Sequence, residues 1–220
     1  AGTGSFSTAK TIAASKAALE AGADGVMIVM PYYNKPTQAG LVQHVLAVAA
    51  AIPKTPIVLY NIPGRTSIDL GVDATVTIFE RAPNVIGIKD ATGNVTRCQH
   101  VINRLGDRVS VLSGDDALTL PMMASGARGV ISVTSNLYPK EVSEVCRLAN
   151  AGNFVEARAK HLALVPVHDV MFIESNPAPI KAALAARGRM HATVRSPLVM
   201  ASDEARAKVL ATIDRFEGRA

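Results

Sequence analysis

The chain has 220 residues, of which 49% are hydrophobic and 19% charged, and its formal net charge is +5. This composition excludes disorder as the main state of the chain. No apolar run approaches the roughly 18 residues that a membrane span needs, and the chain opens without a basic-then-apolar leader. We therefore expect a globular protein with no membrane partner.

The cysteines and the distribution of charge indicate the cellular location and the kind of partner to expect. Cys98 and Cys146 are too few and too far apart for a disulfide framework or a CxxC metal site, so a reducing cytoplasm is the expected location. The segment 181–220 carries most of the positive charge, as eight Lys or Arg against four Asp or Glu. Because acidic residues are interspersed among the basic ones, this pattern predicts a solvated helical surface and not a nucleic-acid interface.

Five short runs rich in β-branched residues predict strands. They lie at 25–31, 56–63, 85–91, 109–114 and 129–134. Segments between them predict helices, as at 8–21, which follows Ser7, and at 39–51. This rhythm is typical of repeated βα units with parallel strands, but the spacing alone fits an open doubly wound sheet as well as a barrel.

After residue 134 the pattern changes to helices only. They are expected at 139–151, 153–174, 176–187 and 202–217. The chain is therefore divided into a partial barrel at 1–151 and a C-terminal helical region at 152–220. The first four residues predict a turn that follows a strand, and a closed barrel needs eight strands where we count five. We expect that roughly three N-terminal strands of the barrel are missing from this chain.

Lys89 is the most informative candidate for chemistry. The two-residue period of a strand places Val85 and Gly87 on the same face as Lys89. Ile86 and Ile88 fall on the other face. A lysine at the carboxyl end of a buried parallel strand lies where α/β barrels hold their active sites. Partial desolvation there lowers the pKa of the amine, which can then attack a carbonyl to form a Schiff base. The alternative is a side chain that extends into solvent.

Tyr60 and Arg65 support the catalytic interpretation of Lys89. Tyr60 lies at the same end of its own run, and a phenol near a lysine can carry the proton that carbinolamine formation and collapse require. Arg65 follows a Pro-Gly turn and is suited to bidentate capture of a carboxylate. The alternatives are a tyrosine at the edge of the core and a surface arginine. Tyr32 and Tyr33 cannot both face one pocket, so we expect one of them to serve an interface.

Six motifs carry a family resemblance. They are AGTG at 1–4, PYYNKP at 31–36, YNIPGRT at 60–66, GIKDATG at 87–93, SGDD at 113–116 and GVISV at 129–133. In this order they resemble the dihydrodipicolinate synthase/N-acetylneuraminate lyase family over essentially the whole chain. The resemblance implies a (β/α)8 TIM barrel with a C-terminal helical region, in a cytoplasmic homotetramer built from tight dimers.

The resemblance also implies a reaction and the residues that perform it. Pyruvate condenses with Lys89, and the enamine adds to L-aspartate 4-semialdehyde to give 4-hydroxytetrahydrodipicolinate, on the route to diaminopimelate and lysine. Tyr60 is implied as the proton relay, Arg65 as the ligand of the semialdehyde carboxylate, and Tyr33 as a relay residue inserted from a neighbouring protomer. Gly114 and the backbone carbonyl of Ile131 are implied to line the site. No metal or organic cofactor is implied.

The sequence departs from the family pattern in two places. The family's Thr-Thr pair falls before Ala1, so residues 1–220 alone are expected to be inactive. The positions of the Asn and Glu that bind the effector in lysine-inhibited relatives match Phe6 and Lys10. A cation at residue 10 would repel the ammonium of lysine, so we expect no feedback inhibition by lysine.

Other assignments stay open at this point. The chain could be another pyruvate-dependent lysine aldolase, acting on N-acetylneuraminate or 2-keto-3-deoxy sugar acids, or an inactive fragment of the family. The loop of Arg65 favours a short carboxylated aldehyde over a long polyol. His161 and His168 share a helix face and are expected to be exposed, not to bind metal. Asp115 and Asp116 are interpreted first as N-cap residues.

Overall fold

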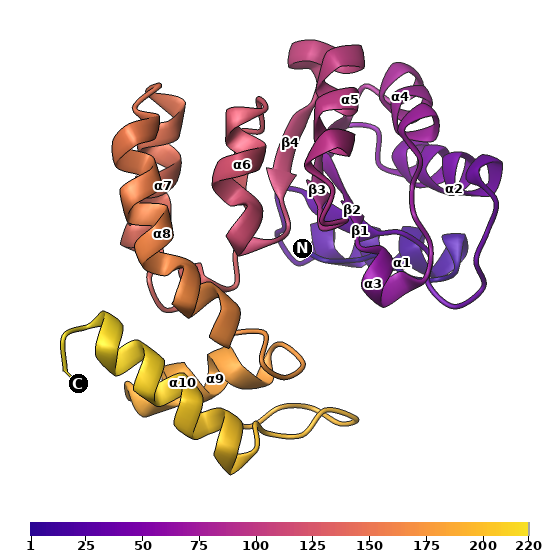
Figure 1. The fold of residues 1–220 in the computed structure, drawn as a ribbon. Coiled ribbons are helices and arrows are strands. Elements are labelled where there is room, and N and C mark those ends of the chain that lie inside the picture. Colours follow the sequence, from indigo (N-terminus) through magenta and orange to yellow (C-terminus); the bar gives the residue numbers. More distant parts are fainter. Residues whose placement is uncertain (220) are drawn as a thin grey trace. The chain divides into compact units, whose positions relative to one another are not determined.

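The computed structural model describes residues 1–219. Its contacts divide the chain into two compact units, Ala1–Ile131 and Ser132–Ala220, which we call the sheet unit and the helical unit. Figure 1 shows the elements of both. The boundary expected at 151/152 lies inside the helical unit, because the two helices on either side of it pack against each other.

The sheet unit contains the five strands that the sequence predicts, four of them with slightly shorter ends. The fifth keeps only two of its six predicted residues, because 131–134 are not strand. The strands are β1 Val26–Val29, β2 Ile57–Asn61, β3 Val85–Asp90, β4 Ser110–Ser113 and β5 Gly129–Val130. All four neighbouring pairs are parallel, in the order β1-β2-β3-β4-β5. A doubly wound sheet reverses its strand order at a switch point. The unbroken sequential order of these five strands instead follows the pattern of a (β/α) barrel.

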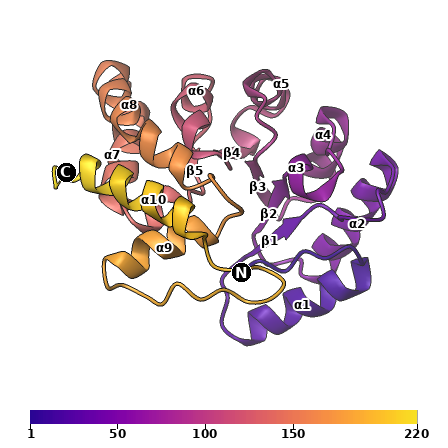
Figure 2. The same cartoon turned by 60° about the horizontal axis from the view of Figure 1, so that its bottom comes forward.

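Helices connect the strands and cover one face of the sheet. They are α1 Thr8–Glu20, α2 Gln38–Ala51, α3 Pro63–Thr66, α4 Val72–Arg81, α5 Val95–Leu105 and α6 Thr119–Ala124, with 3-10 turns η1 Gly106–Arg108 and η2 Asp116–Leu118. Figure 2 shows α1, α2, α4 and α5 along the outer side of the strands. Side-chain caps begin several of them: Ser7, Thr37 and Asn94 each accept a hydrogen bond from a backbone N–H three residues on.

The outer face of the sheet forms the core of the unit. Ile28, Leu59 and Ile88 are fully buried there, as are Leu41 and Val45 of α2. Burying each such side chain stabilises the fold by about 1.5–3 kcal/mol. The opposite face of β2 and β3 carries Tyr60 and Lys89, so the same strands supply both the core and the candidate site.

The register of β2 and β3 corrects one expectation. Ile57 pairs with Val85, but the next residue, Val58, pairs with Gly87, so Ile86 is passed over. This irregularity leaves Ile86 48% exposed and places Val85 beside Ile57, on the core face. The prediction that Val85 shares the face of Lys89 is therefore wrong, because strict alternation fails at the bulge.

The helical unit contains the helices that the sequence predicts after residue 134. They are α7 Pro139–Asn150, α8 Phe154–Val170, α9 Ala178–Ala186 and α10 Asp203–Phe216. The 3-10 turn η3 Thr134–Asn136 precedes them and was not predicted. Its core gathers Val167, Met171, Ala183, Val209 and Ile213, all fully buried. The parallel α/β fold with a C-terminal helical region is thus confirmed. None of the helices described is long and apolar enough to cross a membrane.

His161 and His168 contradict their predicted exposure. Their rings lie 5.6 Å apart on one face of α8, but they are only 6% and 3% exposed. Thr134 Oγ1 lies 2.8 Å from His168 Nδ1 within the same unit. The face that they share is turned to the interior of the helical unit and not to water. No group of three potential metal ligands occurs among residues 1–219.

Candidate active site

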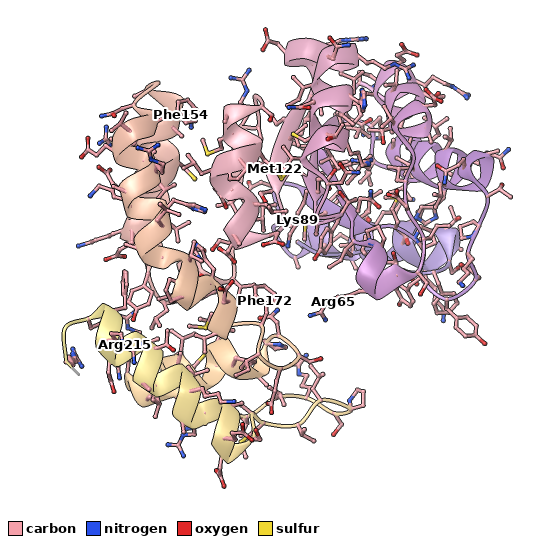
Figure 3. The ribbon with its side chains drawn as sticks, viewed as in Figure 1. Arg65, Lys89, Met122, Phe154, Phe172 and Arg215 are labelled. Carbon is pink, nitrogen blue, oxygen red and sulfur yellow. The ribbon has the colours of Figure 1, made fainter. Side chains whose placement is uncertain are left out.

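Lys89 and Tyr60 meet at the carboxyl end of the sheet. The register of β2 and β3 pairs them directly, so both side chains leave the sheet on the same side. Lys89 Nζ lies 4.2 Å from the centroid of the Tyr60 ring, a cation–π contact. In Figure 3, Lys89 lies at the end of β3. The structure therefore brings together the two residues whose strand positions first indicated chemistry.

The environment of Lys89 favours its neutral amine. Both Lys89 and Tyr60 are half-buried, and burial lowers the pKa of Lys89 below its ordinary value. The carboxylate of Asp116 opposes this shift and the guanidinium of Arg65 adds to it. A larger fraction of this amine is therefore unprotonated near neutral pH than of a solvent-exposed lysine, which is the condition for attack on a carbonyl.

The phenol of Tyr60 is held in its protonated form. Burial raises the pKa of Tyr60, and Arg65 partly offsets that effect. A protonated phenol beside an amine of lowered pKa is a proton donor next to a nucleophile. This pairing supplies the two functions that formation of a carbinolamine and loss of water from it require.

Arg65 is positioned by a short helix immediately after β2. Pro63 begins α3, where its fixed φ suits the first helical position. Thr66 Oγ1 donates to the carbonyls of Ile62 and Ile68 at 3.0 and 2.9 Å, which tightens the turn on both sides of Arg65. Figure 3 shows the Arg65 side chain extending from α3 at the same end of the sheet as Lys89. The predicted loop at this position is helical.

Gly114 lets β4 approach β3 beside the lysine. Its backbone N–H donates to the carbonyl of Asp90 at 2.7 Å. A Cβ placed on Gly114 would lie 2.7 Å from the Cβ of Ala91, too close for any side chain. Ile131, half-buried, continues this edge through a hydrogen bond from its N–H to the carbonyl of Ser113. Both residues therefore lie at the carboxyl ends of the strands, where Lys89 also lies.

Asp115 and Asp116 have different surroundings. Asp115 is the N-cap of η2, with its carboxylate accepting a hydrogen bond from Ala117 N–H at 3.0 Å, so its predicted capping role is confirmed. Asp116 is only 2% exposed, and its charge acts on Lys89. Sequence reasoning missed this role, because adjacent acids before a helix give no sign of which one turns inward.

The two adjacent tyrosines also differ. Tyr32 packs edge-on against the ring of Phe6, with the centroids 5.7 Å apart. Tyr33 is 88% exposed and has a left-handed backbone, with φ of 74°. A large aromatic side chain in this conformation is uncommon. Within the sheet unit, Tyr33 is the more available of the two for another molecule.

Comparison with known proteins identifies the family. Residues 1–216 match the Dihydrodipicolinate synthetase family. The 4-hydroxy-tetrahydrodipicolinate synthase of Sorangium cellulosum is 63% identical over 219 residues, which cover 100% of this chain and 72% of that protein. The structure of the 4-hydroxy-tetrahydrodipicolinate synthase from Methylacidiphilum fumariolicum SolV matches with a TM-score of 0.96 at 44% identity, over 99% of this chain and 72% of that one.

A third similar protein was solved with a small molecule. It is the dihydrodipicolinate synthase from Acinetobacter baumannii complexed with pyruvate, which matches with a TM-score of 0.95 at 42% identity over 100% of this chain and 74% of that one. The likeness extends from the first motif to the last helix, in sequence and in fold. The chain belongs to the Dihydrodipicolinate synthetase family.

Proposed function

We propose that this protein condenses pyruvate with L-aspartate 4-semialdehyde to form 4-hydroxytetrahydrodipicolinate, a step of diaminopimelate and lysine biosynthesis. The observation that carries the proposal is the contact of Lys89 with Tyr60 at the carboxyl end of a parallel sheet. It occurs in a chain that is 63% identical to a protein named for this reaction.

In the first half of the reaction, Lys89 Nζ attacks the keto carbon of pyruvate. The phenol of Tyr60 supplies a proton to the carbinolamine oxygen, and water leaves as the iminium forms. Loss of a proton from the methyl group then gives the enamine, because the iminium nitrogen accepts the electron pair. The lowered pKa of Lys89 favours the first step.

In the second half, the enamine carbon adds to the aldehyde of L-aspartate 4-semialdehyde. The guanidinium of Arg65 binds the carboxylate of that substrate through paired N–H donors. The substrate's own amine then closes the ring on the iminium carbon, and Lys89 is released. Condensation of the two substrates thus liberates one water, and the reaction consumes no oxidant or reductant.

The surroundings of the site have proposed roles as well. Gly114 and the carbonyl of Ile131 line the pyruvate site. The protein forms a cytoplasmic homotetramer, in which Tyr33 of each copy contributes to the proton relay in the site of a neighbouring copy. The 88% exposure and strained backbone of Tyr33 support a role at an interface.

We also propose that lysine does not inhibit the enzyme. Lys10 Nζ lies 5.3 Å from the centroid of the Phe6 ring, so a cation already faces this aromatic surface. A second ammonium would be repelled there. A titration with lysine should leave the rate unchanged, and strong inhibition at submillimolar lysine would refute this proposal.

A competition experiment tests the assignment of substrates. The purified protein is supplied with pyruvate and either L-aspartate 4-semialdehyde or a 2-keto-3-deoxy sugar acid, and pyruvate consumed or released is measured. Consumption of pyruvate that depends on the semialdehyde supports the proposal. Release of pyruvate from N-acetylneuraminate or a sugar acid, without semialdehyde turnover, would instead identify another lysine aldolase.

A further inference from the structure

A buried ion pair lies directly beside the reactive lysine. Asp90 follows Lys89 on β3, and its side chain points to the opposite, core face of the sheet. It is 2% exposed, and its partner Arg97, in the first turn of α5, is 6% exposed. Arg97 Nη1 donates to Asp90 Oδ2. Two charges removed from water in this way require close pairing and further hydrogen bonds.

Those further hydrogen bonds lead away from β3 to another segment. Arg97 Nη2 donates to the carbonyl of Leu70 at 2.6 Å and to Thr75 Oγ1 at 3.2 Å. The second oxygen of Asp90, Oδ1, accepts from both the N–H and the hydroxyl of Thr92. One guanidinium therefore connects the end of β3 to the segment between α3 and α4.

Asn61 holds the same segment from the other side. It is the last residue of β2 and is fully buried. Its Nδ2 donates to Asp69 Oδ1 at 2.7 Å, and its Oδ1 accepts from the N–H of Leu70 at 3.1 Å. Leu70 is thus held through its N–H by β2 and through its carbonyl by Arg97. The connection from Asn61 to Leu70, between these anchors, contains α3 and Arg65, and we call it the loop of Arg65.

We propose that Arg97 is a positioning residue, which holds the loop of Arg65 in place relative to Lys89 and so determines the affinity for the aldehyde substrate. This inference rests on the proposed function. Arg97 lies on the core face and does not contact the substrate. Its effect reaches the substrate through Leu70 and Arg65. We therefore expect Arg97 to change the binding of the semialdehyde carboxylate and not the binding of pyruvate.

The conservative variant Arg97→Lys tests the proposal. Lysine keeps a positive charge beside Asp90, but its single nitrogen cannot reproduce the fork that reaches Asp90 and Leu70 together. We expect KM for L-aspartate 4-semialdehyde to rise on the order of 10-fold, as when a binding group is misplaced. KM for pyruvate and the yield of borohydride-reduced pyruvate adduct on Lys89 should stay within about 2-fold, since pyruvate bonds to Lys89 and this variant keeps the charge of Arg65.

A double-mutant cycle with Arg65→Ala separates positioning from general destabilisation. If Arg97 acts through Arg65, Arg97→Lys should add little to the KM of the Arg65→Ala enzyme. Additive effects, an unchanged KM for the semialdehyde in Arg97→Lys, or an equal rise in KM for both substrates would overturn the proposal. Failure of the unaltered enzyme to form the pyruvate adduct would instead overturn the proposed function.

Two further variants complete the test. Arg104→Met is the matched control, because Arg104 lies on the same helix and pairs with Asp73 of α4 at an exposed position; both KM values should be unchanged. Thr75→Val removes one acceptor of Arg97, together with the hydrogen bond that Thr75 Oγ1 donates to the carbonyl of Gly71 at 2.8 Å. It is the second test if Arg97→Lys does not fold. It should raise KM for the semialdehyde by a smaller factor and leave KM for pyruvate unchanged, and no rise would contradict the proposal.

Discussion

Two tyrosines, half-buried Tyr60 in the sheet unit and buried Tyr138 in the helical unit, show how neighbours decide what a phenol can do. In the sheet unit, Tyr60 faces Lys89, and the charge of Arg65 partly offsets the rise in the Tyr60 pKa that burial causes. In the helical unit, burial also raises the pKa of Tyr138, and its hydrogen bond to Glu217 raises it further. The first phenol lies beside an amine of lowered pKa and near a guanidinium, and the second is hydrogen-bonded to a carboxylate.

The second arrangement ties helices together. The Tyr138 hydroxyl donates to Glu217 Oε1 at 2.9 Å. Arg187 pairs with Glu217 and with Asp214, at 2.9 and 2.6 Å. These bonds join the start of α7, the end of α9 and the end of α10. The comparison shows that a phenol fixed to a carboxylate stabilises structure, whereas one beside an amine of lowered pKa is available for proton transfer.

The largest expected effect is at Lys89. Lys89→Met should lower the condensation rate by at least about 10³-fold, because the covalent nucleophile is removed. The measurement is the steady-state rate with both substrates. Lys54→Met, at an exposed turn, is the control and should retain the parent rate. Comparable rates in the two variants would show that Lys89 is not the nucleophile.

The next largest effect distinguishes the catalytic Tyr60 from the structural Tyr138. Tyr60→Phe should lower kcat by about 10²–10⁴-fold, the usual contribution of a general acid–base group, with little change in the free energy of unfolding. Tyr138→Phe should leave kcat unchanged and lower the free energy of unfolding by about 1.5–3 kcal/mol, as for a hydrogen bond to a charged group. The measurements are kcat and denaturant unfolding. A large loss of kcat in Tyr138→Phe would contradict the comparison.

A smaller effect concerns the pH dependence of adduct formation. The neutral amine reacts, so the rate of pyruvate trapping should rise with pH and level off above the pKa of Lys89. Asp116 raises this pKa and Arg65 lowers it, against the larger lowering by burial. Asp116→Asn should therefore shift the midpoint of the profile to lower pH, and Arg65→Met to higher pH. Shifts of both midpoints in one direction would show that these charges do not act on Lys89 as described.

The smallest effect is on stability in acid. Arg187 and Tyr138 outweigh burial and lower the pKa of Glu217. A carboxyl with a lowered native pKa contributes stability above its unfolded-state pKa, and this contribution is lost as pH falls through the native value. Glu217→Gln should thus lower the free energy of unfolding at pH 7 by about 1–2 kcal/mol, with the difference shrinking in acid. A difference that stays constant from pH 7 to pH 3 would exclude this linkage.

The sequence predicts the site well where strand ends alone determine it. The positions of Lys89 and Tyr60 follow from the ends of two neighbouring runs, because parallel strands bring their carboxyl ends together. The face of Val85 was wrong because a bulge between Ile57 and Val58 interrupts the alternation. The one local signal of that bulge is Gly87, because a glycine inside a strand often marks such an irregularity.

Burial of polar side chains could not be predicted in the same way. His161 and His168 lie on a helix rich in Ala, Val and Leu, so its apolar residues do not distinguish one inward face. The pairing of Asp90 with Arg97 depends on how α5 packs against the sheet. Seven residues separate the two, and no short-range rule for strands or helices joins them across the turn between β3 and α5.

Reduction by borohydride in the presence of pyruvate, followed by peptide mass spectrometry, tests the central claim most directly. The amine of Lys89 should gain the mass of one pyruvic acid less one oxygen atom, since water is lost and two hydrogens are added on reduction. We expect one such adduct per chain, on the peptide that contains Lys89. An unmodified Lys89, or an adduct distributed over exposed lysines, would contradict this expectation.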